Sequence, residues 1–172
     1  MSEIFDYVDE NDRVIGQETR AGVHRKGLYH RAVHIFSRSE SGKWILQRRS
    51  AEKDLEPLLW TTSCSGHVDT GEAYLDAAIR EFQEELGAQV NSCDLVEVLR
   101  LSPCVETGNE FVRVYLCKNH VRPLPDPHEI LELGEFTVSE ITRLVEADEG
   151  RFCKSFVHLF SLVSSRIEIF FK

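Results

Sequence analysis

The sequence is poor in basic residues and in long apolar runs. Its 20 Lys and Arg face 29 Asp and Glu, which gives a formal net charge of -9 at pH 7. This balance argues against binding of a nucleic-acid polymer, since phosphate backbones are held by clustered Lys and Arg. No run approaches the ~18 apolar residues of a membrane helix. The start, MSEIFDYVDENDRV, lacks the basic and apolar regions of a secretion signal. We expect a cytoplasmic protein without membrane contact.

The chain also lacks paired cysteine motifs. Its five cysteines are an odd number and show no C-x-x-C spacing, which argues against a disulfide framework or a structural zinc site. Reduced thiols are the expectation for Cys64, Cys93, Cys104, Cys117 and Cys153.

Length and patterning indicate one domain, residues 1–172, with a sizeable core. Alternating apolar and polar residues predict strands, and a 3.6-residue repeat predicts helices. Strands are expected on both sides of a turn at 9–12, and at 31–38, 44–47, 59–62, 89–101, 111–118 and 135–138. Helices are expected from about 73 to the glycine at 87, from 139 to 147 and from 152 to 163, with 21–30 as a loop. This order predicts the α/β or α+β class.

The stretch GHVDTGEAYLDAAIREFQEELGA, residues 66–88, gathers three carboxylates on one helix face. Glu81, Glu84 and Glu85 fall within roughly a third of the helix circumference, because positions three and four apart are neighbours. Their mutual repulsion calls for a counter-ion, and hard oxygen ligands suit Mg²⁺ or Mn²⁺. A solvated acidic face is the alternative for a Glu-rich helix taken alone. The opposite face is an apolar stripe: Leu75, Ala78, Ile79, Phe82 and Leu86.

The fixed spacing of this stretch resembles the box of the Nudix hydrolases, written G, five residues, E, seven residues, R-E-U-x-E-E-x-G-U, with U a bulky apolar residue. Every fixed position matches, and Ala88 is small for the last U. The resemblance implies the Nudix fold, a mixed β-sheet sandwiched between α-helices. It also implies a Mg²⁺-dependent (or Mn²⁺-dependent) pyrophosphohydrolase acting on a small-molecule diphosphate.

The flanking segments VDENDRVIGQETR, HRKGLYHRAVHIF, LQRRS and LWTTSCSGH look like the isopentenyl-diphosphate isomerase-like branch of Nudix proteins. Imidazoles and acidic residues hold a divalent metal in that branch. The residues that match its ligands are His67, His30, His24, with a gap altered by one residue, and Glu110. The resemblance therefore implies a candidate second metal site, beside the alternative that these histidines are ordinary loop or surface residues.

Ser65 separates this chain from true isomerases. It occupies the position of their catalytic cysteine, while Cys64 is displaced by one residue, and a shift of one along a strand turns a side chain to the opposite face. We expect Cys64 to be a small buried residue. Isomerases of this type tend to have an eroded box, whereas the box here is intact. Hydrolase therefore ranks above isomerase.

The box spacing motivates a hypothesis for the mechanism. Glu81 and Glu85 would bind Mg²⁺ directly, with Glu84 as a further ligand or base and the backbone carbonyl of Ser65 as another ligand. Arg80 would pair with a neighbouring carboxylate and fix its rotamer. The metal would bridge diphosphate oxygens and lower the pKa of an attacking water. The proton would pass to Glu84 or Glu110.

Three functions remain open: a hydrolase of nucleoside diphosphate derivatives or related organic diphosphates, an isopentenyl-diphosphate isomerase, and a non-catalytic nucleotide sensor. Selectivity is expected from the loops 55–59, 103–109 and 122–129. The C-terminal RIEIFFK is compatible with an edge strand, a contact in a homodimer, or neither.

Overall fold

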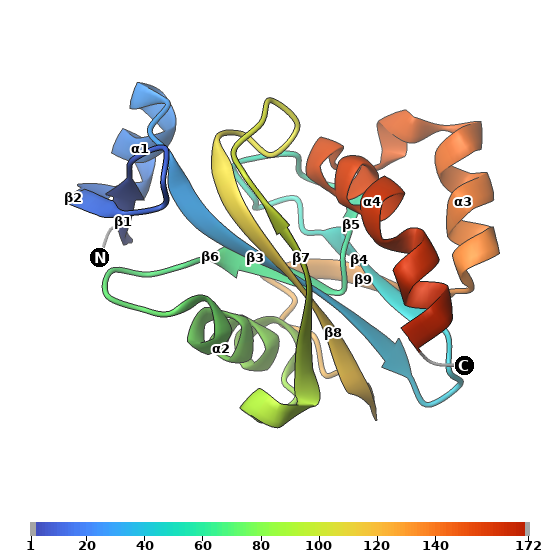
Figure 1. Cartoon of the computed structure of the whole chain (residues 1–172). Coiled ribbons are helices and arrows are strands. Elements are labelled where there is room, and N and C mark those ends of the chain that lie inside the picture. The colour runs from blue at the N-terminus through green and yellow to red at the C-terminus, as the bar shows by residue number, and fades with distance from the viewer. Residues whose placement is uncertain (1–2, 171–172) are drawn as a thin grey trace.

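The structure is a computed structural model that describes residues 3–170. A central sheet lies between α2 on one side and α3 and α4 on the other, while β1, β2 and α1 group at one end (Figure 1). The elements are β1 (Ile4–Val8), β2 (Val14–Thr19), α1 (Arg20–Lys26), β3 (His30–Ser39), β4 (Trp44–Arg49), β5 (Trp60–Thr61), β6 (Cys64–His67), α2 (Tyr74–Leu86), the 3-10 turn η1 (Ser92–Asp94), β7 (Leu95–Leu101), β8 (Glu110–Val121), β9 (Ile130–Phe136), α3 (Val138–Ala147), η2 (Glu149–Arg151) and α4 (Lys154–Phe170).

The seven-stranded sheet is mixed and forks along one strand. Strands β3 and β8 pair in parallel at its centre, and the other pairings are antiparallel. On its other edge β3 pairs first with β6, over residues 32–35, and then with β4, over residues 37–38. Strands β4 and β6 therefore diverge from one shared neighbour. This fork becomes part of the candidate site.

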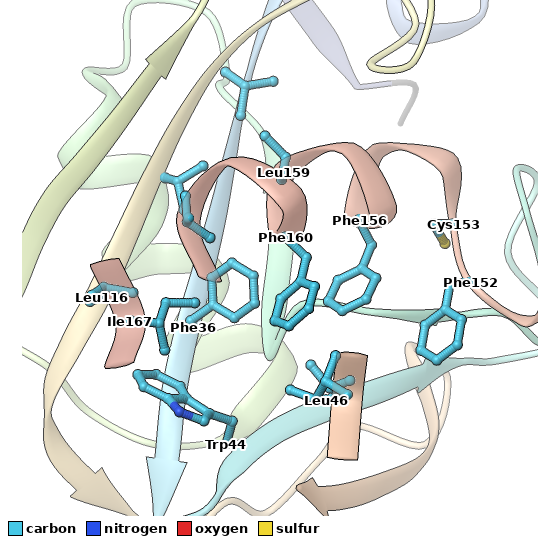
Figure 2. Close-up of a cluster of buried hydrophobic side chains, with 14 of the residues drawn as sticks. Phe36, Trp44, Leu46, Leu116, Phe152, Cys153, Phe156, Leu159, Phe160 and Ile167 are labelled. Atoms are coloured by element: carbon cyan, nitrogen blue, oxygen red, sulfur yellow. The ribbon is translucent and has the colours of Figure 1, made fainter. Parts of the chain in front are cut away.

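Each face of the sheet has its own core. The first core joins α2 to alternate residues of β3 and β8, including Val33, Ile35 and Tyr115. The second joins α3 and α4 to the intervening residues. In Figure 2 the rings of Phe156 and Phe160 lie in a row, and their centroids are 5.7 Å apart. Burial of an aromatic side chain of this size stabilises the fold by about 1.5–3 kcal/mol.

Helix α2 confirms the sequence expectation. Its buried residues include Ala78, Phe82 and Leu86 from the apolar stripe. The helix ends at Gly87, whose φ of 61° is left-handed and therefore favours glycine. A Cβ at this position would also come within 2.6 Å of the Leu124 carbonyl oxygen. Both constraints fix the end of α2 at Gly87. The three glutamates therefore lie in the last two turns of the helix.

Several local expectations were wrong. The strand expected at 89–101 begins only at Leu95, because residues 92–94 form the 3-10 turn η1. The loop expected at 21–30 contains α1, because Thr19 accepts a hydrogen bond from Gly22 N and Gly27 ends the helix in a left-handed conformation. The last strand, β9, begins at 130 rather than 135, since it pairs with β4 over most of its length. The helix expected to start at Ser139 begins one residue earlier, with Thr137 as its N-cap.

The C-terminal segment is helical as far as the structure describes it. Helix α4 continues to Phe170, so an edge strand over 166–170 is wrong, and residues 171–172 lie outside the described part. Ile167 packs with Val163 in the core, which explains the longer helix. None of the helices within residues 3–170 has the length and apolar character needed to cross a membrane.

Candidate active site

One cavity of about 470 Å³ collects most of the predicted site. Seven predicted residues line it: Ser65, His67, Arg80, Glu81, Glu84, Glu85 and Glu110. The other two, His24 and His30, pack against His67 with ring centroids 5.4 and 5.1 Å away. Segments 55–59 and 122–129 contribute lining residues, whereas no residue of 103–109 is among those that line it. The expected contribution of 103–109 to selectivity therefore stays a prediction that the lining of this cavity does not support.

Glu85 is held in the fork between β4 and β6. Its Oε2 accepts hydrogen bonds from Gln47 Nε2 at 2.8 Å and from the Ser65 backbone N–H at 3.1 Å. The residue is only 3% exposed. Burial raises the pKa of Glu85 to about 7, although these hydrogen bonds and Lys53 favour the ionised form. The fork thus positions one carboxylate from α2 against the backbone of β6.

Glu81 lies against the glycine turn. An ideal Cβ on Gly66 would meet Glu81 Cδ at 2.0 Å, so only glycine leaves room for this carboxylate. Burial, and then the charge of Glu85, raises the pKa of Glu81 to about 8. The first glycine of the box, Gly66, is therefore required because any larger residue would clash with the Glu81 carboxylate.

Arg80 organises the carboxylates from one side. Its guanidinium donates to both oxygens of Glu72, at 3.0 and 2.9 Å, in the two-point geometry that suits a planar fork. Nη1 donates to Glu81 at 2.7 Å and to Glu84 at 3.1 Å, and Nη2 donates to the His67 carbonyl at 2.9 Å. The expected pairing with a neighbouring carboxylate is present. Glu72 has a role here that its place near the helix start did not suggest.

The three glutamates differ in exposure, although they share a helix face. The Glu84 side chain is 59% exposed, compared with 14% for Glu81. Glu84 thus reaches solvent at the cavity, and Glu81 and Glu85 lie inside it. One buried and one partly buried carboxylate with raised pKa values lie together here, and a hard divalent cation would stabilise their ionised forms. The oxygen donors present fit Mg²⁺ or Mn²⁺.

A second cluster contains the three histidines. Side-chain nitrogens of His24, His30 and His67 all lie within 4.8 Å of one another. Glu110 Oε1 is 3.1 Å from His67 Nε2 and 3.5 Å from His30 Nε2. Burial alone would raise the pKa of Glu110, but the hydrogen bond with His67 and the nearby His30 imidazole hold it well below its usual range. The carboxylate is therefore ionised next to the imidazoles.

This cluster contains buried ring nitrogens that lack a hydrogen-bond partner within the described part of the chain. His24 Nε2 is buried and has no hydrogen-bond partner among residues 3–170. Burial, followed by repulsion from His67 and His30, lowers the pKa of His24 and favours the neutral ring that binds metals. The ring of Phe5 covers His67, with centroids 4.6 Å apart. The residues present fit a second divalent cation.

Cys64 points away from the cavity. It is fully buried in the core beside α2, and burial raises its pKa well above the usual value for a thiol. Ser65, the next residue along β6, is opposite His34 and lines the cavity with it. The expected inversion between the two residues is confirmed. No thiolate is available at the position where the isomerase pattern places its cysteine.

The cavity also contains cations to which the sequence analysis assigned no role: Arg20, Arg49 and Lys53. Lys53 forms an ion pair with Glu129, and Arg49 donates two hydrogen bonds to the Leu55 carbonyl at 3.1 and 3.0 Å. Three cations beside a carboxylate site suit an anionic substrate. The segment LQRRS could have indicated this positive charge, because it places two adjacent arginines at the end of an expected strand in an otherwise acidic chain.

Comparison with known proteins identifies the family and the fold. The NUDIX domain profile matches residues 28–156. An isopentenyl-diphosphate Δ-isomerase of Serratia proteamaculans is 44% identical over 144 residues, which cover 83% of this chain and 80% of that protein. An uncharacterized Nudix hydrolase of Nostoc sp. is 37% identical over 148 residues, 86% of this chain and 88% of that protein. The crystal structure of DR0079 from Deinococcus radiodurans is similar, with a TM-score of 0.72 at 30% identity, covering 85% of this chain and 90% of that one.

Proposed function

The chain belongs to the Nudix family, and on that basis we propose that it is a Mg²⁺-dependent pyrophosphohydrolase. Its substrate would be a nucleoside diphosphate derivative or a related organic diphosphate. The observation that carries the proposal is the complete carboxylate set in one cavity: Glu81, Glu84 and Glu85, oriented by Arg80. Lys53 and Arg49 in the same cavity offer the positive charge that a diphosphate needs.

The residues that would hold Mg²⁺ or Mn²⁺ are Glu81 and Glu85, with the carbonyl of Ser65 as a further ligand and with Glu84 as either a further ligand or the base. When bound, the cation offsets charge on the diphosphate and activates water. Arg80 keeps the Glu81 carboxylate in place through its hydrogen bonds. Lys53 and Arg49 bind the diphosphate oxygens.

The base must reach water and still touch the metal site. Glu84 meets this requirement, because its side chain is 59% exposed at the cavity and is bonded to Arg80. Glu84 takes the proton from the attacking water in this proposal. Glu110 is the alternative base, but it already accepts a hydrogen bond from His67.

Isomerisation of isopentenyl diphosphate is the second candidate. The cluster of His24, His30, His67 and Glu110 favours it, and we propose that this cluster binds a second divalent cation. The burial of Cys64 and the presence of Ser65 argue against it, since no thiol lines the cavity at that position. A second cation is also compatible with diphosphate hydrolysis.

Phosphorus NMR of product mixtures separates these functions. The panel contains nucleoside diphosphate sugars, nucleoside triphosphates, dinucleotides and prenyl diphosphates, each with Mg²⁺. Hydrolysis releases new phosphate resonances, whereas isomerisation converts isopentenyl diphosphate to its allylic isomer without phosphate release. No turnover together with tight binding of one nucleotide would indicate a sensor and contradict both enzyme proposals.

A matched pair of variants tests the metal assignment. We expect Glu85→Gln to reduce Mg²⁺-dependent turnover by about 10²-fold or more, in line with the loss of a group that stabilises the reacting charges. Glu146→Gln changes an exposed glutamate of α3 and should match the unmodified protein. Equal turnover by Glu85→Gln and the unmodified protein would reject the assignment.

A further inference from the structure

The loop at 103–109 does not line the cavity, and two of its side chains, Cys104 and Glu106, instead approach His158 of α4. Cys104 and Glu106 of the loop and His158 of α4 bring their ligand atoms within 4.8 Å of one another. Cys104 and His158 are partly buried and Glu106 is exposed, so the cluster is open to solution. Figure 1 shows the loop between β7 and β8 beside α4. This cluster is separate from both carboxylate and histidine sites described above.

We propose that Cys104, Glu106 and His158 form a binding site for Zn²⁺ or a similar borderline-soft divalent cation. A thiolate, an imidazole and a carboxylate are the three side-chain types that bind Zn²⁺, usually with four ligands in total. Tetrahedral coordination at usual bond lengths places ligand atoms about 3.5 Å apart. Small rotamer changes would therefore close the cluster around an ion, and water would be the fourth ligand.

The loop is ordered by its own backbone, so the ligands need little reorganisation. Asn109 N donates to the Cys104 carbonyl at 3.3 Å, and Gly108 N donates to the Val105 carbonyl at 3.3 Å. Thr107 Oγ1 accepts from the Cys104 backbone N–H at 3.4 Å. This turn holds the Cys104 backbone, and the Cys104 thiol lies 3.4 Å from Thr107 Oγ1 and within 4.8 Å of a ligand nitrogen of His158.

The ligand chemistry distinguishes this site from the others. The site combines a thiol, an imidazole and a single exposed carboxylate. The carboxylate set on α2 offers hard oxygen donors and favours Mg²⁺, whereas a thiolate favours softer ions. The spacing of cysteines along the chain did not reveal this site, because its ligands come from two distant segments.

A cation bound at this cluster would restrain the loop 103–109, which leads into the active-site residue Glu110. The loop leads directly into Glu110, and Thr107 Oγ1 donates to the Glu110 carbonyl at 3.3 Å. The carbonyl of Asn109 accepts from the His30 backbone N–H at 3.4 Å. A cation shared by the loop and α4 would thus restrain the backbone on which Glu110 and His30 depend.

Cobalt substitution tests the site in the intact 172-residue chain. Metal-free, reduced protein is titrated with Co²⁺, and we expect the near-ultraviolet charge-transfer absorption of a cobalt–thiolate bond, lost on addition of Zn²⁺. Cys104→Ser should abolish it. Cys93→Ser, which removes the exposed thiol of η1, should retain it. Absence of the band in the unmodified protein, or its persistence in Cys104→Ser, would overturn the proposal. The histidine cluster contains no thiolate and cannot produce this band.

Alkylation provides a measurement that needs no variant. We expect Zn²⁺ to slow the reaction of Cys104 with iodoacetamide by about 10-fold or more, because a coordinated thiolate is a poorer nucleophile than a free one. Mg²⁺ at the same concentration should not protect it. Cys93, measured in the same digest by mass spectrometry, should react equally with either metal. Equal rates at Cys104 with Zn²⁺ and Mg²⁺ would contradict the site.

Discussion

The carboxylate of Glu81 lies where a side chain at residue 66 would have to be. An ideal Cβ on Gly66 meets Glu81 Cδ at 2.0 Å and Oε1 at 2.1 Å. The turn and the helix are thus in contact at the two most characteristic positions of the box. Since Arg80 also donates to Glu81 at 2.7 Å, the carboxylate cannot move without losing this bond.

Gly66→Ala should therefore damage the metal site while the fold persists. The added methyl group displaces the Glu81 carboxylate, which is the flexible end of a side chain, rather than the backbone. We expect metal affinity to fall by about 10- to 100-fold, the usual cost when a ligand loses its support. Calorimetric Mg²⁺ titration measures it, and circular dichroism monitors the fold.

Gly150→Ala is the matched control for that substitution. A Cβ there meets only Asp148 Oδ1, at 3.4 Å, and the position lies far along the chain from the box. Its Mg²⁺ affinity should equal that of the unmodified protein. If Gly66→Ala also bound Mg²⁺ normally, the contact with Glu81 would have no part in the metal site.

The sequence predicts α2 and its carboxylates well, because both depend on local spacing. The apolar stripe, the glycine stop and the convergence of Glu81 and Glu85 all follow from a 3.6-residue period. The inversion of Cys64 and Ser65 follows from the two-residue period of a strand. These features require only residues that are close in the chain.

What the sequence did not reveal depends on contacts between distant segments. Gln47 reaches Glu85 across 38 positions because β4 and β6 diverge from β3, and strand pairing of this kind has no local signal. The length of β9 likewise depends on its pairing with β4. Helix α1 was missed for a different reason, since its seven residues are too few for a clear period and its cap Thr19 ends a strand.

Arg80→Lys should show that the planar fork matters as well as the charge. A lysine ammonium cannot donate to both oxygens of Glu72 and to Glu81 and Glu84 at once. We expect a decrease in Mg²⁺-dependent turnover of about 10- to 100-fold. Arg100→Lys is the control, because Arg100 is 70% exposed and pairs with a neighbour on β7, Glu97. Equal activity of the two variants would mean that any cation suffices at position 80.

The metal-free protein should become less stable as pH rises from 6.5 to 8.5. Burial raises the pKa of Glu81 to about 8 and that of Glu85 to about 7, from a reference of 4.5. Between about pH 4.5 and pH 8 the folded chain therefore holds protons that the unfolded chain has already released, so the free energy of unfolding contributed by these groups falls over this range and levels off above it. Below 6.5 the lowered pKa values of His24 and His34 have the opposite effect, since stability is lost as pH falls.

Mg²⁺ should offset the loss of stability at high pH, because it binds the ionised carboxylates of Glu81 and Glu85. We expect the rise in melting temperature caused by saturating Mg²⁺ to be larger at pH 8.5 than at pH 6.5, as measured by thermal unfolding with and without the cation. Glu81→Gln should show a weaker pH dependence in the metal-free state. A Mg²⁺ effect that is equal at both pH values would contradict the linkage between proton release and metal binding.

Lys53→Gln should weaken substrate binding more than catalysis. The Lys53 side chain is 18% exposed in the cavity, and its ammonium group lies near Glu85 and pairs with Glu129. If it binds the diphosphate in the ground state as well as the transition state, its loss raises KM with a smaller change in kcat. We expect KM to rise by about 10-fold, consistent with loss of one charge-assisted hydrogen bond.

Lys43→Gln, which removes a more exposed lysine outside the cavity, should leave both parameters unchanged. A fall in kcat at constant KM would instead place Lys53 at the reacting bond, where charge develops only in the transition state.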